Sequence, residues 1–521
     1  MAQASAGHGR AAAQTYRAAA ERAGDQASAV RYKRLAASHL QRSGDFARGR
    51  QLTGEVLDAM GARVPRTTAG LVGSLALEGL RMSFRGHGFV RRPASALPAG
   101  KLEQLDTYLA LQVDTTLVDP LRAALFQARQ LRLALAAGEP ERVLLAMCGE
   151  LLSVSIAATP RAERRAERIR GRMEALTTEV DTPLSRAFVC ASAAVSHFMF
   201  GRYQEVIEPS YEAERLMLGL GADRGEGNYF TRLAAAAARM AAFAPLGRFR
   251  LMRQESAQVL REARGTDNHC AVLQLALVET LAEDCLGHLE ASVERLASQS
   301  SQLPDGPFSM LHLIHMVARL WAVCGTGDLD AGLALLQEWW PRYRRAAVRR
   351  VGSLRTIAEA TRLRLLISAA HRQRRPPSRS LVREARALAR RPAPMAAGYG
   401  ARALSRLAFL EGNRELALGL LRASSASFTT ADARFEEARN QAAADQLNDR
   451  TGAPREAAVA RLREAGHERP DLAVASHFPE LPVVSWVITA SRELSNRLCF
   501  KRRSMSSARV RWTWKRCRHA M

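Results

Sequence analysis

A short pattern recurs along this chain of 521 residues: an Ala- and Leu-rich segment, a glycine, a polar or charged residue, then a second amphipathic segment. The glycines of the pattern are Gly44, Gly138, Gly201, Gly247, Gly287, Gly327 and Gly412. Glycine adopts the left-handed conformation at a helix end without a Cβ penalty, so each is predicted to end one helix and let the next fold back. The following residue is often Asp, Glu or Asn, which can cap the next helix.

The spacing of these glycines predicts a repeat. Gly201, Gly247, Gly287 and Gly327 are separated by 46, 40 and 40 residues, and the intervals 44–138 and 327–412 are each close to two such units. Two helices of about 16 residues with short turns fill one unit. The interval from Gly138 to Gly201 is 63 residues and indicates an irregular insertion. Because a single hairpin leaves one apolar face wet, the hairpins are expected to stack into an all-α solenoid.

Breaks in the pattern divide the chain into four regions. We expect N-terminal helical hairpins over 1–65, an irregular linker with one helix (70–84) over 66–100, and a tetratricopeptide-like superhelix over 101–482 with a fraying helical end from 450. A basic tail over 483–521 is expected to be disordered. It is either a basic arm, with Trp512 and Trp514 for contacts to nucleic acid or lipid, or a non-native extension.

The composition is typical of a helical protein, and it weakens the argument that the net positive charge indicates binding of nucleic acid. Lys occurs four times, so Arg supplies 72 of the 76 basic residues behind the net charge of +25. Such one-sided Arg usage is typical of a GC-rich genome, and nine basic residues fall in the last 25, so a solvated surface is favoured over a nucleic-acid footprint. No apolar stretch of 18 residues occurs, which predicts no membrane span and a cytoplasmic protein.

Motifs for chemistry are missing from the sequence. There is no GxxxxGK[ST] phosphate loop, protein-kinase motif, HExxH or GxSxG elbow, and GLGADRGEG from Gly219 is interpreted as a loop. His312 and His315 share a helix face but have no nearby Cys, Asp or Glu to complete a metal site, so core or groove histidines are favoured. We therefore expect no catalytic residue, cofactor or metal. The seven cysteines are scattered and are interpreted as buried free thiols.

One cluster of aromatic and basic residues is the best candidate for binding a partner. Trp339 and Trp340 either fill the seam between two hairpins or anchor a partner on a concave face. The arginines that follow have no acid between Glu338 and Glu359, which suits an acidic partner; they are Arg342, Arg344, Arg345, Arg349 and Arg350. A second arginine cluster over 161–172 is interleaved with Glu163 and Glu167, and is interpreted as a solvated helix with internal ion pairs.

Several segments resemble a known family. DPLRAALFQARQLRLALAAGEPERVLLAMCGE from Asp119 and RLAASHLQRSGDFARGRQLTGEVLDAMGARVP from Arg34 resemble the C-terminal, tetratricopeptide-like region of large bacterial multidomain serine/threonine protein kinases. The resemblance covers roughly residues 10 to 480. In that family a kinase domain and an AAA-type ATPase precede this region, and both are missing here, so no catalytic or nucleotide-binding residue carries over. The resemblance implies a sensor or scaffold segment.

Three functions follow as hypotheses. The leading one is a non-catalytic protein–protein interaction scaffold or sensor, linked to a kinase/ATPase signalling system, whose concave surface receives a peptide or domain of unknown identity. The second is an Arg-rich regulatory solenoid that binds nucleic acid. The third is a fragment of a kinase-family enzyme, for which ATP binding would be diagnostic.

Overall fold

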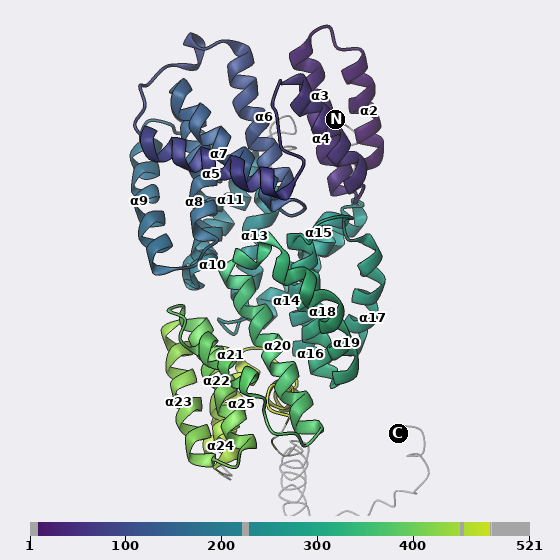
Figure 1. Cartoon of the computed structure of the whole chain (residues 1–521), viewed down its shortest axis with the longest axis vertical. Coiled ribbons are helices and arrows are strands. Elements are labelled where there is room, and N and C mark those ends of the chain that lie inside the picture. Colours follow the sequence, from purple (N-terminus) through teal and green to yellow (C-terminus); the bar gives the residue numbers. More distant parts are fainter. Residues whose placement is uncertain (1–8, 221–228, 449–452, 480, 482–521) are drawn as a thin grey trace, which may run out of the picture. The chain divides into compact units, whose positions relative to one another are not determined.

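The computed structural model describes residues 9–220, 229–448, 453–479 and 481, and residues up to Leu481 form one compact unit. Within these residues the chain is helical with connecting turns and contains no strand, which confirms the predicted all-α solenoid (Figure 1). The expected disordered tail, with Cys499, Cys517, Trp512 and Trp514, lies outside the described residues, as does most of the loop expected after Gly219.

The first part of the unit runs from the N-terminal hairpin to α10. Its elements are α2 (Gly9–Glu21), α3 (Gln26–Arg42), α4 (Phe46–Ala59), α5 (Thr68–Arg85), η1 (Ala94–Ala96), α6 (Ala99–Thr115), α7 (Pro120–Ala137), α8 (Pro140–Ser155), α9 (Pro160–Thr177) and α10 (Pro183–Phe200). The helix expected over 70–84 is α5.

The middle part leads to the two long helices α18 and α20. Its elements are η2 (Gln204–Val206), α11 (Ile207–Gly219), α13 (Tyr229–Phe243), α14 (Phe249–Gly265), α15 (His269–Gln274), α16 (Ala276–Leu286), α17 (Leu289–Gln299), η4 (Ser300–Gln302), α18 (Met310–Thr326), α19 (Leu329–Arg345), η5 (Ala347–Arg350) and α20 (Gly352–Arg372). The last part comprises α21 (Arg379–Ala389), α22 (Pro394–Leu410), α23 (Arg414–Thr430), α24 (Arg434–Leu447), α25 (Ala453–Glu464) and α26 (Pro470–Ala475).

The recurring glycines are the turns between helices, as predicted. All seven have positive φ, between 69° and 83°. The residue after the glycine caps the next helix at four of the turns: Asp45, Glu139, Asp328 and Asn413 accept hydrogen bonds from backbone N–H groups of the first helical turn. At the other three turns the cap position holds no such side-chain bond.

The irregular glycine spacing has a structural cause. Among the described residues, two helices lie between Gly201 and Gly247 and between Gly287 and Gly327, and four lie between Gly327 and Gly412. Between Gly247 and Gly287 the second helix is interrupted at Leu275, which divides it into α15 and α16. Three helices, α8, α9 and α10, separate Gly138 from Gly201, so α9 is the insertion. Since α10 packs against α8 as well as α9, the stacking of hairpins continues past the additional helix.

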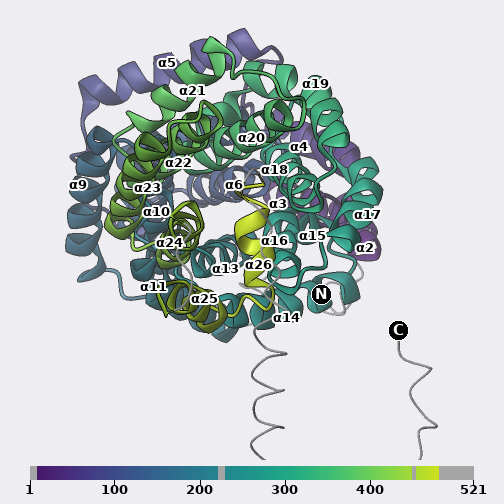
Figure 2. The same ribbon diagram turned by 90° about the horizontal axis from the view of Figure 1, so that it is seen from below.

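The stacked helices wind so that segments distant in sequence meet. The backbone N–H of Met310 donates to Leu117 O at 3.1 Å, and that of Gly352 donates to Ile156 O at 2.8 Å. Further along, the N–H of Phe435 donates to Pro245 O at 3.3 Å. Figure 2 shows the helices of the unit around a centre, with α26 inside and α9, α17 and α19 at the outside. Successive turns of the superhelix therefore contact one another directly.

The core runs along the inner helices. α18 (MLHLIHMVARLWAVCGT) is apolar on all sides, and all but a few of its residues are buried between α16, α17, α19 and α20, as expected for a central helix. Of the described cysteines, Cys148, Cys270, Cys285 and Cys324 are buried and free, which confirms their interpretation as buried free thiols, whereas Cys190 is free but only half-buried. None of the described helices combines the length and apolar character needed to span a bilayer.

Candidate partner-binding surface

Trp339 belongs to the seam between α18 and α19. It is 4% exposed, and its ring centroid lies 6.0 Å from that of Phe308 and 5.9 Å from that of His315. The neighbouring Tyr343 is 1% exposed and packs in the same cluster. Trp339 thus fills the hairpin seam, the first of the two roles that the sequence allowed, and its side chain is not available as a surface anchor.

Trp340 lies at the rim of this seam. It is half-buried, and the Arg362 guanidinium of α20 lies 4.8 Å from its ring centroid. Arg362 in turn forms an ion pair with Glu384 of α21. The indole therefore packs against a basic side chain that is already paired.

The five arginines that follow lie together on the surface. Arg342, Arg344 and Arg345 form the last turn of α19, Arg349 and Arg350 lie in η5, and all five are exposed. Within the described residues none of the five guanidinium groups forms an ion pair or a hydrogen bond; Arg342 instead lies 5.9 Å from the Phe308 ring centroid. We name these five residues the α19 arginine patch. They sit where the negative end of the α19 dipole favours cations.

The buried residues between these arginines fix the patch in place. Trp339, Tyr343 and Val348 hold α19 and η5 against the core. Nearby basic residues outside the patch are paired, because Arg355 and Arg391 both bind Glu359. The patch is therefore a rigidly supported positive surface without carboxylates of its own.

The second arginine cluster, on α9, is only partly paired: of its arginines, Arg165 and Arg170 form ion pairs among the described residues. Glu163 and Glu167 both bind Arg202, which follows α10, with the Glu163 contact at 2.6 Å. Arg165 binds Glu150 of α8 at 2.8 Å. Only the long contact between Arg170 and Glu167, at 3.9 Å, lies within α9, so the predicted internal ion pairs are largely pairs between helices. The sequence could not show that these ion pairs join different helices, because the paired residues are distant along the chain.

His312 and His315 have structural roles. Ser309 caps α18 and its hydroxyl lies 2.8 Å from His312 Nδ1, while His315 Nε2 lies 3.0 Å from the Ser300 hydroxyl. Burial lowers the pKa of His312 to about 4 and that of His315 to about 3, so both are neutral near pH 7. No group of three potential metal ligands occurs among the described side chains.

The end of the described chain departs from its expected fraying. The N–H of Glu468 donates to Cys285 O at 2.9 Å, and its carboxylate binds Arg253 at 2.7 Å. Phe478 and Leu481 are 2% and 5% exposed in the largest core cluster. The segment 465–481, which contains α26, is therefore packed inside the superhelix, and the prediction of a fraying end is wrong.

Buried arginines of the inner helices hold this segment. Arg364 of α20 donates from Nε to Ser476 O at 2.7 Å, and its Nη1 lies 3.2 Å from His477 Nε2. Burial and the positive charge of Arg364 lower the pKa of His477 well below its usual value, so the ring accepts as a neutral base. At these positions the concave face, where the sequence placed a partner peptide, is occupied by the chain itself. The hydrophobic residues of the segment 465–481 were the only feature of the sequence that indicated its position inside the superhelix.

Comparisons with known proteins give no relative from which a role could be transferred. No protein-family model matches the chain, and no curated protein matches it significantly.

Proposed function

We propose that the protein is a non-catalytic interaction scaffold that binds an acidic segment of a partner protein on the α19 arginine patch. The observation that carries this proposal is five exposed guanidinium groups that lack acidic partners among the described residues, on a helix fixed by buried aromatic residues. Arg presents planar, multiple donors that suit carboxylates, and a pre-organised patch loses little entropy on binding.

The residues with reactive side chains elsewhere support a non-catalytic role. Burial raises the pKa of Cys148 and of Cys270 to about 12, which keeps their thiols protonated and unreactive. His312 and His315 are neutral, and each ring contacts a serine hydroxyl. The family resemblance supports the further proposal that the partner belongs to a serine/threonine kinase or ATPase signalling system.

Binding of a fluorescently labelled, Asp/Glu-rich peptide of about 15 residues tests the patch. The double variant Arg344→Glu/Arg345→Glu is expected to weaken binding about tenfold or more, because each change removes one attraction and adds one repulsion. Arg164→Glu/Arg168→Glu on α9 is the matched control, since both arginines are exposed and the change in charge is identical. This control is expected to stay within about twofold of the wild type.

A labelled DNA duplex of about 20 base pairs, titrated at several salt concentrations, tests the alternative. Equal peptide affinity in both double variants would contradict the scaffold proposal. Steeply salt-dependent DNA binding without peptide binding would favour a nucleic-acid-binding solenoid. Saturable binding of ATP would instead favour the enzyme hypothesis.

A further inference from the structure

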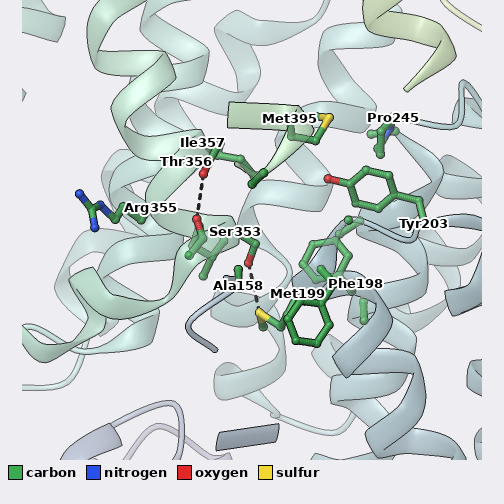
Figure 3. A pocket seen from close by; sticks show the side chains of 18 of the residues that line it. Ala158, Phe198, Met199, Tyr203, Pro245, Ser353, Arg355, Thr356, Ile357 and Met395 are labelled. Carbon is green, nitrogen blue, oxygen red and sulfur yellow. Dashed lines mark hydrogen bonds between the residues drawn. The ribbon is translucent and has the colours of Figure 1, made fainter. Parts of the chain in front are cut away.

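A cavity of about 650 Å³ lies inside the superhelix and shares only Arg350 with the α19 arginine patch. Residues of α10, α13, α16, α18, α20, α22 and α24 line it, so helices from distant parts of the sequence enclose it. Figure 3 shows Phe198, Met199, Ile357 and Met395 among the apolar side chains around it. Protein interiors contain few voids larger than a water molecule, and cavities that bind small molecules measure about 300–1,000 Å³. The volume of this cavity therefore fits a small-molecule ligand.

Small side chains on α13 create the space. Ala234, Ala237 and Ala241 of α13, and Ala244 in the turn that follows it, line the cavity and are half-buried. Neighbours such as Ala235 and Ala242 are fully buried against other helices. A larger residue on this face of α13 would project into the cavity. Substitution of these alanines would therefore change the volume of the cavity at positions that do not face the hydrophobic core.

Several polar groups that line the cavity lack a hydrogen-bond partner among the described residues. The Tyr203 ring is 9% exposed, its hydroxyl points into the cavity in Figure 3, and it makes no hydrogen bond with any described residue. Hydroxyl groups inside proteins ordinarily have a partner, so the unpaired Tyr203 hydroxyl is available to a hydrogen-bonding group of a bound molecule. His467, which is 1% exposed and also lines the cavity, has no hydrogen-bond partner on either ring nitrogen.

The charged residues around the cavity are already held. Glu163 pairs with Arg202, Glu436 with Arg439, Arg355 and Arg391 with Glu359, and Asp284 accepts from the Trp321 indole. A charged ligand would lose its hydration, and of the described lining carboxylates only Asp284 lacks an ion pair, so a charge buried inside would be poorly compensated. Arg350 lines the cavity as well, but it is exposed, so the cavity meets solvent beside η5.

We propose that this cavity binds an uncharged, mainly apolar small molecule with one hydrogen-bonding group, which meets the Tyr203 hydroxyl. The apolar part lies against the alanine face of α13 and the side chains of Phe198, Met199 and Ile357. Arg350 borders both this cavity and the α19 arginine patch, but Arg344 and Arg345, the residues changed to test the patch, do not line the cavity, so the two proposals are tested separately.

A neutral fluorescent probe, N-phenyl-1-naphthylamine, tests the site on the full chain. Saturable binding with one probe per chain is expected, and Ala237→Phe, which fills the cavity, should weaken it at least tenfold. Ala423→Phe makes the same change on an exposed face of α23 and should leave binding unchanged. Equal binding in all three proteins, or no saturable binding to the wild type, would overturn the proposal.

Competition on the wild type identifies the ligand class even if Ala237→Phe fails to fold. 1-Decanol should displace the probe at least tenfold more effectively than decanoate or decylammonium, which carry the same chain with a charge. Tyr203→Phe preserves the volume and should weaken the decanol competition about three- to tenfold, the value of one hydrogen bond, while probe binding persists. Decanoate as effective as decanol, or decanol competition unaffected by Tyr203→Phe, would contradict the proposed chemistry.

Discussion

At the scale of the residue, different physical effects oppose the replacement of different turn glycines. Gly138 and Gly327 have nearly equal φ, +82° and +79°. A Cβ on Gly138 would lie 1.9 Å from the Val90 carbonyl oxygen, whereas a Cβ on Gly327 would meet nothing within 4 Å. Gly138 also joins the loop before α6 to the solenoid, because its carbonyl accepts from Arg92 N at 2.9 Å.

The variants Gly327→Ala and Gly138→Ala separate these two effects. Gly327→Ala is expected to lower the free energy of unfolding by about 1 kcal/mol, the strain of a left-handed alanine. Gly138→Ala should lower it by clearly more, because the Val90 backbone must also move. Thermal unfolding followed by circular dichroism measures both, and equal losses would show that the close approach of Val90 is unimportant.

Buried neutral histidines make the stability depend on pH. Burial lowers the pKa of His467 from its usual 6.5 to about 4, and its ring stacks on Phe435 with centroids 5.7 Å apart. Between these values the unfolded chain binds a proton that the folded chain does not. Stability is therefore lost as the pH falls below about 6.5, by at most about 1.4 kcal/mol per pH unit for each such histidine.

His467→Phe is expected to remove one of these contributions. The loss of unfolding free energy between pH 7 and pH 5 should shrink by about 2 kcal/mol relative to the wild type. Burial raises the pKa of Glu436, but Arg439 and Arg402 outweigh it and hold the value at about 2, so that carboxylate does not titrate in this window. Urea unfolding at both pH values gives the comparison, and an unchanged difference would mean that His467 is not the group titrating.

At the scale of the element, α26 and its flanking residues behave as part of the core. α26 has six residues and no side-chain cap, so its position depends on the contacts of the segment 465–481 and not on helix propensity. Its neighbours α25 and α24 return the chain to α14, where Phe249 N donates to Ala465 O at 3.1 Å. The segment completes the interior that the preceding helices leave open.

Phe478→Ala tests this role. The side chain is 2% exposed in the largest core cluster, so its removal should lower the unfolding free energy by about 3 kcal/mol. Leu416→Ala on α23, where the side chain is 49% exposed, is the control and should change stability by less than about 0.5 kcal/mol. Similar small effects of both substitutions would place the segment outside the cooperative core.

At the scale of the whole compact unit, contacts between successive turns should make unfolding more cooperative than in an open solenoid. In a solenoid whose repeats touch only their neighbours, unfolding can begin at one end and proceed stepwise. Here Phe435 of α24 packs edge-to-face on Phe249 of α14, with centroids 4.5 Å apart, although 186 positions separate them. Such contacts couple the last hairpins to the middle of the chain.

Phe435→Ala is expected to loosen that coupling. Amide hydrogen exchange should show α22–α25 opening at a lower urea concentration than α16–α20, whereas in the wild type both regions should exchange together. Phe409→Ala, a half-buried phenylalanine at the end of α22, is the comparison and should leave the two regions coupled. Separate opening already in the wild type would contradict the coupling.

The sequence by itself determined the local features of this protein. These features are the turns at Gly44 through Gly412, the caps at Asp45, Glu139, Asp328 and Asn413, the all-α class and the burial of four of the five described cysteines. They depend on backbone conformation and on the polarity of neighbouring residues, which a sequence states directly. The irregular interval after Gly138 was visible too, although not that a whole helix, α9, fills it.

Only the tertiary structure decided what the superhelix encloses. The burial of Trp339, the pairing of the α9 arginines with distant partners, the position of residues 465–481 and the cavity beside Tyr203 all depend on contacts between residues far apart in the chain. Such contacts depend on how successive turns of the superhelix pack against one another. The same amphipathic sequence pattern is compatible with several such packing arrangements. The interior is therefore a property of the packed unit, although each hairpin that builds it is encoded locally.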